Sequence, residues 1–205
     1  MKTRRRARQQ QQQQLPRLTP SEAIFLSLFA IYYLSSSSFL VASMRIVVQR
    51  VKSASVTVEG KVVSQIGPGL LALVGLHEHD SETDAQDLCK KLLACKLWEN
   101  SESGGQWRHS VKQKGYEVLL VSQFTLYGTL SKKNQPDYKL AMKSIPAQAL
   151  YTRFVELVRH NYQADRVMDG VFGAMMDVEL VNDGPVTLMM ETNPEQPTEK
   201  TEEDG

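Results

Sequence analysis

Hydroxyl and amide side chains follow directly on an apolar run in the segment Ser122-Gln-Phe-Thr-Leu126. The preceding residues Val118–Val121 are aliphatic, which predicts a buried strand that ends where the polar side chains begin. Such a strand end offers unpaired backbone N–H groups beside the Ser122, Gln123 and Thr125 side chains, and these groups together can bind a carbonyl. The alternative is a polar strand end that hydrogen-bonds only its own turn.

The hydroxyl of Thr125 is a weak nucleophile unless a base takes its proton. No histidine lies near it in the sequence, since the histidines are His77, His79, His109 and His160. A Gly-x-Ser-x-Gly elbow is also absent from the sequence. The sequence therefore favours a site that binds and polarises a carbonyl over one built around a catalytic triad.

A second candidate segment, Asn182-Asp-Gly-Pro185, separates two apolar runs near the end of the chain. These residue types favour a turn, because glycine tolerates positive φ and proline restricts φ. Residues 171–181 alternate apolar and polar side chains, and Val186–Met190 form a second run. We expect the second run to pair back on the first as a hairpin.

Two further groups of reactive side chains do not amount to a site. His77-Glu-His-Asp80 contains metal-ligand types, but neighbouring loop residues need further ligands that the sequence does not supply. Cys89 and Cys95 lie six residues apart in a helical pattern, which fits neither a zinc pair nor a redox Cys-x-x-Cys motif. We therefore predict no metal site and interpret both cysteines as small helix residues.

A frame of strands and helices must position these groups. Strands are predicted over residues 45–51, 55–58, 61–66, 70–76, 117–123, 171–181 and 186–190. The run 70–76 is wholly apolar, so it should be central and buried on both faces. Helices are predicted after Ser81, where Asp84 complements the helix dipole, and from Pro146. We expect an α+β fold: a mixed, mostly antiparallel sheet or half-barrel with two helices packed on one side.

Both ends of the chain differ in composition from the predicted folded unit, Met44–Thr192. Residues 1–43 combine basic residues, a glutamine tract and an apolar stretch too short to span a bilayer, which predicts a disordered or targeting leader. Met44 is an alternative start. Residues 193–205 predict an acidic disordered tail. We expect a cytoplasmic protein without stable membrane association, or a plastid or mitochondrial one if the leader directs import.

The formal net charge of the whole chain is only +1, so an RNA partner would require a local basic patch. Six basic side chains in two polar segments are candidates: Lys132, Lys133, Lys139, Lys143, Arg108 and Lys112. An ordinary solvated surface is an equally good interpretation of these residues.

Three segments together resemble the D-aminoacyl-tRNA deacylase family, also called D-tyrosyl-tRNA(Tyr) deacylases. They are Arg45-Ile-Val-Val-Gln-Arg-Val51, Ser122–Leu126 and Asn182-Asp-Gly-Pro-Val-Thr187, with Phe172-Gly-Ala174 as a weaker fourth match. The similarity covers Met44–Thr192 in the expected order. It implies an enzyme without a cofactor that hydrolyses the ester of D-aminoacyl-tRNA, or of glycine mischarged on tRNA(Ala), in chiral proofreading.

The resemblance also implies roles for the first candidate segment. Ser122, Gln123, Phe124 and Thr125 would line the pocket around the aminoacyl ester, where Thr125 has been assigned as nucleophile. The free hydroxyl on the terminal ribose of tRNA offers a different route, because it can activate water or polarise the carbonyl. Backbone N–H groups near Phe124 and Thr125 would then stabilise the oxyanion.

For the second segment, the resemblance implies a cis Gly184-Pro185 bond in a loop that enters the pocket of a partner subunit in an obligate homodimer. Main-chain carbonyls there would collide with an L side chain. Arg50 would hold the loop, and at least one of Met176 and Phe172 would face the adenine. Two alternatives stay open: a non-catalytic nucleic-acid-binding module of the same fold, and a sibling deacylase with a trans Gly-Pro bond that acts on small L-amino acids.

Overall fold

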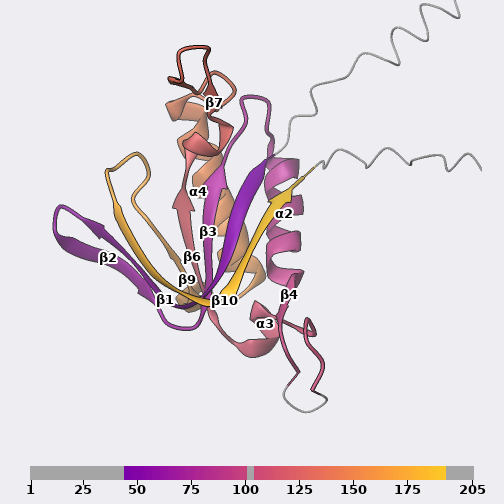
Figure 1. Cartoon of the computed structure of the whole chain (residues 1–205). Coiled ribbons are helices and arrows are strands. Elements are labelled where there is room, and N and C mark those ends of the chain that lie inside the picture. The colour runs from indigo at the N-terminus through magenta and orange to yellow at the C-terminus, as the bar shows by residue number, and fades with distance from the viewer. Residues whose placement is uncertain (1–43, 101–103, 193–205) are drawn as a thin grey trace, which may run out of the picture. The chain divides into compact units, whose positions relative to one another are not determined.

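The computed structural model describes residues 44–100 and 104–192 (Figure 1). The predicted leader, 1–43, and the predicted tail, 193–205, lie outside these ranges. All described residues belong to one compact unit. Its elements are β1 (Arg45–Val58), β2 (Lys61–Ile66), β3 (Gly69–Gly75), α2 (Glu82–Ala94), β4 (Lys96–Trp98), β5 (His109–Ser110), α3 (Val111–Lys114), β6 (Glu117–Ser122), η1 (Phe124–Tyr127), β7 (Thr129–Leu130), β8 (Pro136–Asp137), α4 (Ser144–Asn161), η2 (Ala164–Arg166), β9 (Val167–Asp169) and β10 (Asp177–Glu191).

The main sheet is mixed, with the strand order β10-β1-β3-β6-β9 and with β2 paired to β1. Strand β1 is antiparallel to β10, β2 and β3, whereas β3, β6 and β9 run parallel. The predicted central position of the 70–76 run is confirmed. Leu70 packs into the apolar cluster on one face of the sheet and Leu71 into the cluster on the other. An apolar side chain is therefore needed at both positions.

The two predicted strands near the start form one continuous strand, β1, of 14 residues. Its second half pairs with β2, and this hairpin bends away from the rest of the sheet (Figure 1). A second apolar cluster joins that half of β1 to β3 and β6 and includes Val51, Val56 and Leu119. The curled, mixed sheet agrees with the predicted half-barrel.

The predicted hairpin at Asn182-Asp-Gly-Pro185 is wrong. Strand β10 pairs antiparallel with β1 on both sides of this segment, since Asn182 faces Val51 and Val186 faces Arg50. The three residues between Asn182 and Val186 bulge out of the strand as a loop. Val186–Met190 therefore continues along β1 instead of pairing back on the preceding run, because β1 is long enough to pair with both halves of β10.

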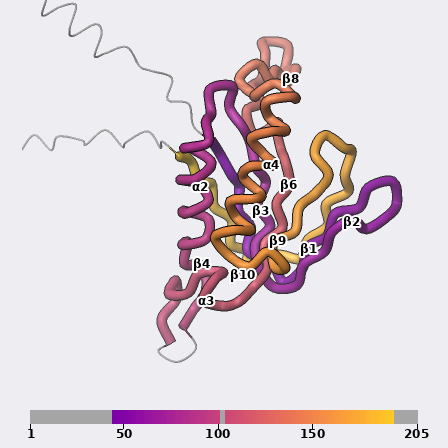
Figure 2. The backbone as a smooth tube through the Cα atoms, turned by 180° about the vertical axis from the view of Figure 1, so that it is seen from behind, coloured from indigo at the N-terminus to yellow at the C-terminus, as the bar shows by residue number. Residues whose placement is uncertain are grey.

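Helices α2 and α4 pack on one face of the sheet (Figure 2). The prediction of two helices is incomplete, because the described residues also form the four-residue helix α3 and two short 3-10 helices. Helix α2 begins as predicted after Ser81, whose N–H and hydroxyl both donate to the Asp84 carboxylate at 2.9 and 2.6 Å. No helix in the described ranges is long and apolar enough to cross a membrane.

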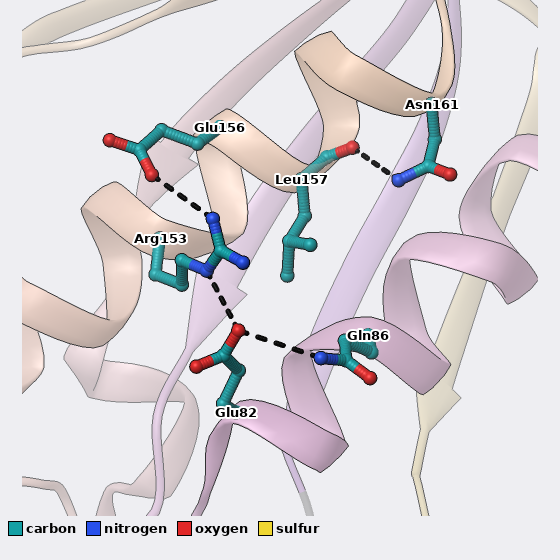
Figure 3. A network of polar contacts seen from close by, with 6 residues as sticks. All are labelled: Glu82, Gln86, Arg153, Glu156, Leu157 and Asn161. Carbon is teal, nitrogen blue, oxygen red and sulfur yellow. Dashed lines mark hydrogen bonds and ion pairs between the residues drawn. The ribbon is translucent and has the colours of Figure 1, made fainter.

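An exposed polar network links the two long helices (Figure 3). Arg153 of α4 contacts Glu82 of α2 at 2.8 Å and Glu156 of its own helix at 3.3 Å. Pairs as exposed as these contribute little to stability. The buried apolar side chains that α2 and α4 share, among them Leu88 and Phe154, hold the helices on the sheet.

Candidate active site

A cavity of about 760 Å³ opens where the parallel strands β3 and β6 end. Its volume lies within the range of small-molecule sites. The lining comes from the ends of β3 and β6, from η1, and from residues 138–147 and 172–178. Six of the predicted site residues line it, namely Ser122, Gln123, Phe124, Thr125, Phe172 and Met176, and three, Arg50, Gly184 and Pro185, do not.

The predicted strand end lies at the floor of this cavity. The Gln123 N–H donates to the Val74 carbonyl at 2.7 Å, directly after the last paired residue of β6, Ser122. The chain then turns into η1, and the Gln123 side-chain amide donates to the Thr125 hydroxyl. The first N–H groups of a helix have no acceptor within it, so those of Phe124 and Thr125 are available to a ligand.

Phe124 is exposed at the mouth of the cavity, with 57% of its surface accessible. Its ring meets that of Tyr138 edge to face, with 4.9 Å between the centroids. Gly128 makes this approach possible, because an added Cβ would lie 2.9 Å from Tyr138 Cε1 and 3.0 Å from the Thr125 carbonyl oxygen. The pair is suited to pack against a planar group.

One wall of the cavity is fastened to the end of β3. The Met142 N–H donates to the Leu76 carbonyl at 2.9 Å, and the Glu78 N–H donates to the Leu140 carbonyl at 3.0 Å. Sequence reasoning did not single out Tyr138 or Met142 as site residues. Tyr138 is an aromatic residue within a polar connection, which is a signal that could have found it.

The opposite wall contains the two predicted adenine contacts. Phe172 lines the cavity and its ring lies 5.6 Å from that of the buried Tyr151. Met176 packs on Gly170, where an added Cβ would lie 2.9 Å from its sulfur. Both side chains are therefore placed to contact a ligand, and their assignment to adenine stays a prediction.

Lys143 and Tyr138 are the ionisable side chains among the described residues that line the cavity. His77 lies outside it, against Tyr127, and burial lowers its pKa. Nearby, burial raises the pKa of Asp80 to about 7. The described lining thus offers no carboxylate or imidazole that could serve Thr125 as a base. Within the described ranges no three His, Cys, Asp or Glu side chains are grouped as metal ligands would be.

Arg50 holds the loop that bulges from β10. Its Nε lies 3.1 Å from both the carbonyl oxygen and the Oδ2 of Asp183, and its Nη1 donates to the Leu97 carbonyl. The Gly184-Pro185 bond is cis and Gly184 has a φ of 121°. Arg50 therefore has the contact that the resemblance implies, while the loop's role in specificity stays a prediction.

The family model described as D-Tyr-tRNA(Tyr) deacylase matches residues 47–191. The chain belongs to this family. Relatives of this deacylase family named "D-aminoacyl-tRNA deacylase" include one from Drosophila melanogaster, which is 48% identical over 77% of this chain and 98% of its own length. Another from Dictyostelium discoideum is 45% identical over 73% of this chain and 98% of its own length. The human "D-aminoacyl-tRNA deacylase 1" is 44% identical over 73% of this chain and 70% of its own length.

Two solved structures have the same deacylase-family fold. The "c-Myc DNA Unwinding Element Binding Protein" is 42% identical, with a TM-score of 0.69 over 75% of this chain and 99% of its own. A "probable eukaryotic D-amino acid tRNA deacylase" has a TM-score of 0.64 and covers 73% of this chain and 99% of its own. At 19% identity, the second supports the fold alone. As a member of the deacylase family, the chain is an enzyme of the hydrolase class.

Proposed function

We propose that the chain hydrolyses the ester that joins a D-amino acid, or glycine, to the 3′ end of tRNA. The observation that carries this proposal is the strand end Ser122–Thr125, which lines a cavity large enough for an aminoacyl nucleoside, in a chain of the deacylase family. Water adds to the ester carbonyl carbon and the bond from that carbon to the ribose oxygen breaks. The ribose oxygen takes a proton, so the products are the free amino acid and tRNA.

In this proposal the protein positions the ester and stabilises the developing oxyanion. The N–H groups of Phe124 and Thr125 are the donors, and one such donor is worth roughly 10² to 10³ in rate. The Thr125 hydroxyl accepts a hydrogen bond from the Gln123 amide, which is no base. The neighbouring ribose hydroxyl of the substrate supplies the activation of water that the described lining does not.

Selectivity for D-amino acids would come from the loop Asp183–Pro185 of a second copy of the chain. Gly184 and Pro185 are exposed and do not line the cavity of their own chain, which supports an action on a partner. Strand β10 is at the edge of the sheet and exposes Val181 and Met189, apolar side chains that a second copy would cover. The main chain of the loop would then leave no room for an L side chain.

The full chain is expected to release D-tyrosine from D-tyrosyl-tRNA, and glycine from glycyl-tRNA(Ala), and to leave L-tyrosyl-tRNA intact. The assay follows the ester by acid precipitation of labelled aminoacyl-tRNA. Equal hydrolysis of the two tyrosine enantiomers would contradict the chirality proposal. Release of L-alanine in preference to D-alanine would indicate the sibling activity, and binding without hydrolysis would indicate the non-catalytic module.

Action between subunits can be tested by co-expressing two damaged copies with different tags. Ala174→Trp fills the cavity of one copy, and Gly184→Val disrupts the loop of the other. A heterodimer retains one intact cavity that faces one intact loop, so selective D-tyrosyl-tRNA hydrolysis should return in the doubly purified pair. Hydrolysis of both tyrosine enantiomers by the pair, or full and selective activity of a wild-type protein that sediments as a monomer, would rule out the trans arrangement.

We also propose that the protein acts in the cytoplasm, with import into a plastid or mitochondrion as the alternative if residues 1–43 direct it. Imaging of the chain with a C-terminal tag, together with sequencing of its mature N-terminus, distinguishes the two. An N-terminus cut near Met44 in an organelle fraction would contradict the cytoplasmic assignment.

A further inference from the structure

Four exposed lysines lie in residues 128–144, the segment that follows η1 and leads into the cavity wall, and they are called the basic rim here: Lys132, Lys133, Lys139 and Lys143. The first two lie between β7 and β8, at the end of a hairpin that projects beyond α4 (Figure 1). Lys143 itself lines the cavity. Residues 128–144 contain one carboxylate, that of Asp137. The segment is therefore strongly positive in a chain whose overall charge is close to zero.

The structure separates the basic rim from the other cations that the sequence suggested for RNA. Arg108 and Lys112 precede β6, whereas the cavity and the β7–β8 hairpin follow it. A strand of six residues separates these two ends by about 20 Å. Arg108 and Lys112 thus lie at the other end of the sheet and cannot contact the nucleotides next to one bound in the cavity.

The basic rim is available to a ligand. Its four lysines are exposed, and Lys139 pairs with Asp137 at 2.8 Å while its side chain stays 85% accessible. Among the described residues, no carboxylate lies within ion-pair distance of Lys132, Lys133 or Lys143. Gly128 lies against Tyr138, which lines the cavity, and Lys132 follows Gly128 by four residues. Four extended residues span at most about 13 Å, so the hairpin lysines are within reach of phosphates close to the mouth.

We propose that the basic rim binds the phosphates of the unpaired 3′ strand of tRNA that lead to the terminal nucleotide in the cavity. This inference rests on the proposed function, because it takes the ligand to be tRNA. The hairpin lysines contribute affinity through charge, and the ester chemistry stays at the strand end. Each phosphate neutralised on a single strand makes the slope of log affinity against log salt more negative by roughly 0.7. Loss of a phosphate contact therefore makes the slope shallower.

The test compares the full-length wild type with Lys132→Gln/Lys133→Gln in binding uncharged tRNA across a series of KCl concentrations. We expect the double variant to bind roughly tenfold more weakly at low salt, with a salt slope shallower by about 1 to 1.5. The matched control is Lys61→Gln/Lys90→Gln, which removes the same charge from exposed sites on β2 and α2. The control should bind with the affinity and slope of the wild type.

A tRNA trimmed of its unpaired 3′ nucleotides tests where the lysines act. The difference between the wild type and the Lys132/Lys133 variant should disappear on the trimmed tRNA. A difference that persists would overturn the assignment to the 3′ strand, and equal binding of intact tRNA by variant and control would overturn the basic rim altogether. If the wild type binds tRNA through these lysines but leaves D-tyrosyl-tRNA intact, the proposed function fails and the basic rim stands.

Discussion

Replacement of Gly184 by alanine should cost stability and selectivity together. A φ of 121° is one that L residues rarely adopt, and such a conformation costs about 1–3 kcal/mol. The added Cβ would also lie 2.9 Å from Val186 Cγ2 and 3.2 Å from Arg50 Nη2. Because the second contact is with the side chain that holds the loop, the loop should shift. We estimate a total loss of about 2–3 kcal/mol, or roughly 4–12 °C in melting temperature.

Gly60 provides the matched control for this change. Its φ is also positive, at 76°, but an added Cβ would meet nothing within 4 Å. Gly60→Ala should therefore show the conformational cost alone, about 1–2 kcal/mol, with normal discrimination between tyrosine enantiomers. Urea denaturation and the ratio of D- to L-tyrosyl-tRNA hydrolysis are measured for both variants at one protein concentration. If Gly184→Ala were no less stable and no less selective than Gly60→Ala, the inferred role of the loop would be refuted.

Three further changes probe the site and its surroundings. Thr125→Ala should lower kcat/KM for D-tyrosyl-tRNA less than Gly184→Ala does, because the described residues that line the cavity include no carboxylate or imidazole to activate the Thr125 hydroxyl. Complete loss of activity in the Thr125 variant alone would support a nucleophile. Gly128→Ala should raise KM several-fold by displacing Tyr138, and an unchanged KM would contradict this. Burial raises the pKa of Asp80 from 3.8 to about 7, so the folded state retains a proton between these pH values that the unfolded chain has lost. The unfolding free energy should therefore fall as pH rises through that window, and the fall should be smaller in Asp80→Asn. Urea unfolding midpoints of both proteins at several pH values test this. An equal pH dependence in the wild type and the variant would contradict the role of Asp80.

The elements with a strong local pattern were predictable from the sequence. Leu70–Leu76 is wholly apolar and lies at the centre of the sheet, and Ser81 with Asp84 marks the start of α2. The strand end Ser122–Thr125 was recognisable because an aliphatic run stops there. Each of these features depends on side chains within a few residues of one another.

The errors arose where distant strands decide the outcome. Asn182-Asp-Gly-Pro185 has the composition of a turn, yet β1 is long enough to pair with the strand on both sides and keeps it extended. The cavity wall around Tyr138 and Met142 depends on bonds to the end of β3, which no local pattern reveals. Lys143 and Arg108 were equal candidates for RNA binding in the sequence. The structure distinguishes them because Arg108 precedes β6 and Lys143 follows it, which places them at opposite ends of that strand.

The floor of the cavity consists of strand ends that are also part of the protein's apolar interior. Val121 is buried in the second apolar cluster and lines the cavity as well, whereas Met175 at the mouth is 93% exposed. Substitutions of floor residues will change substrate fit only at the expense of folding. Substitutions at the mouth are free of that coupling, so natural or engineered changes in tRNA preference should accumulate there and leave the thermal resistance of the enzyme intact.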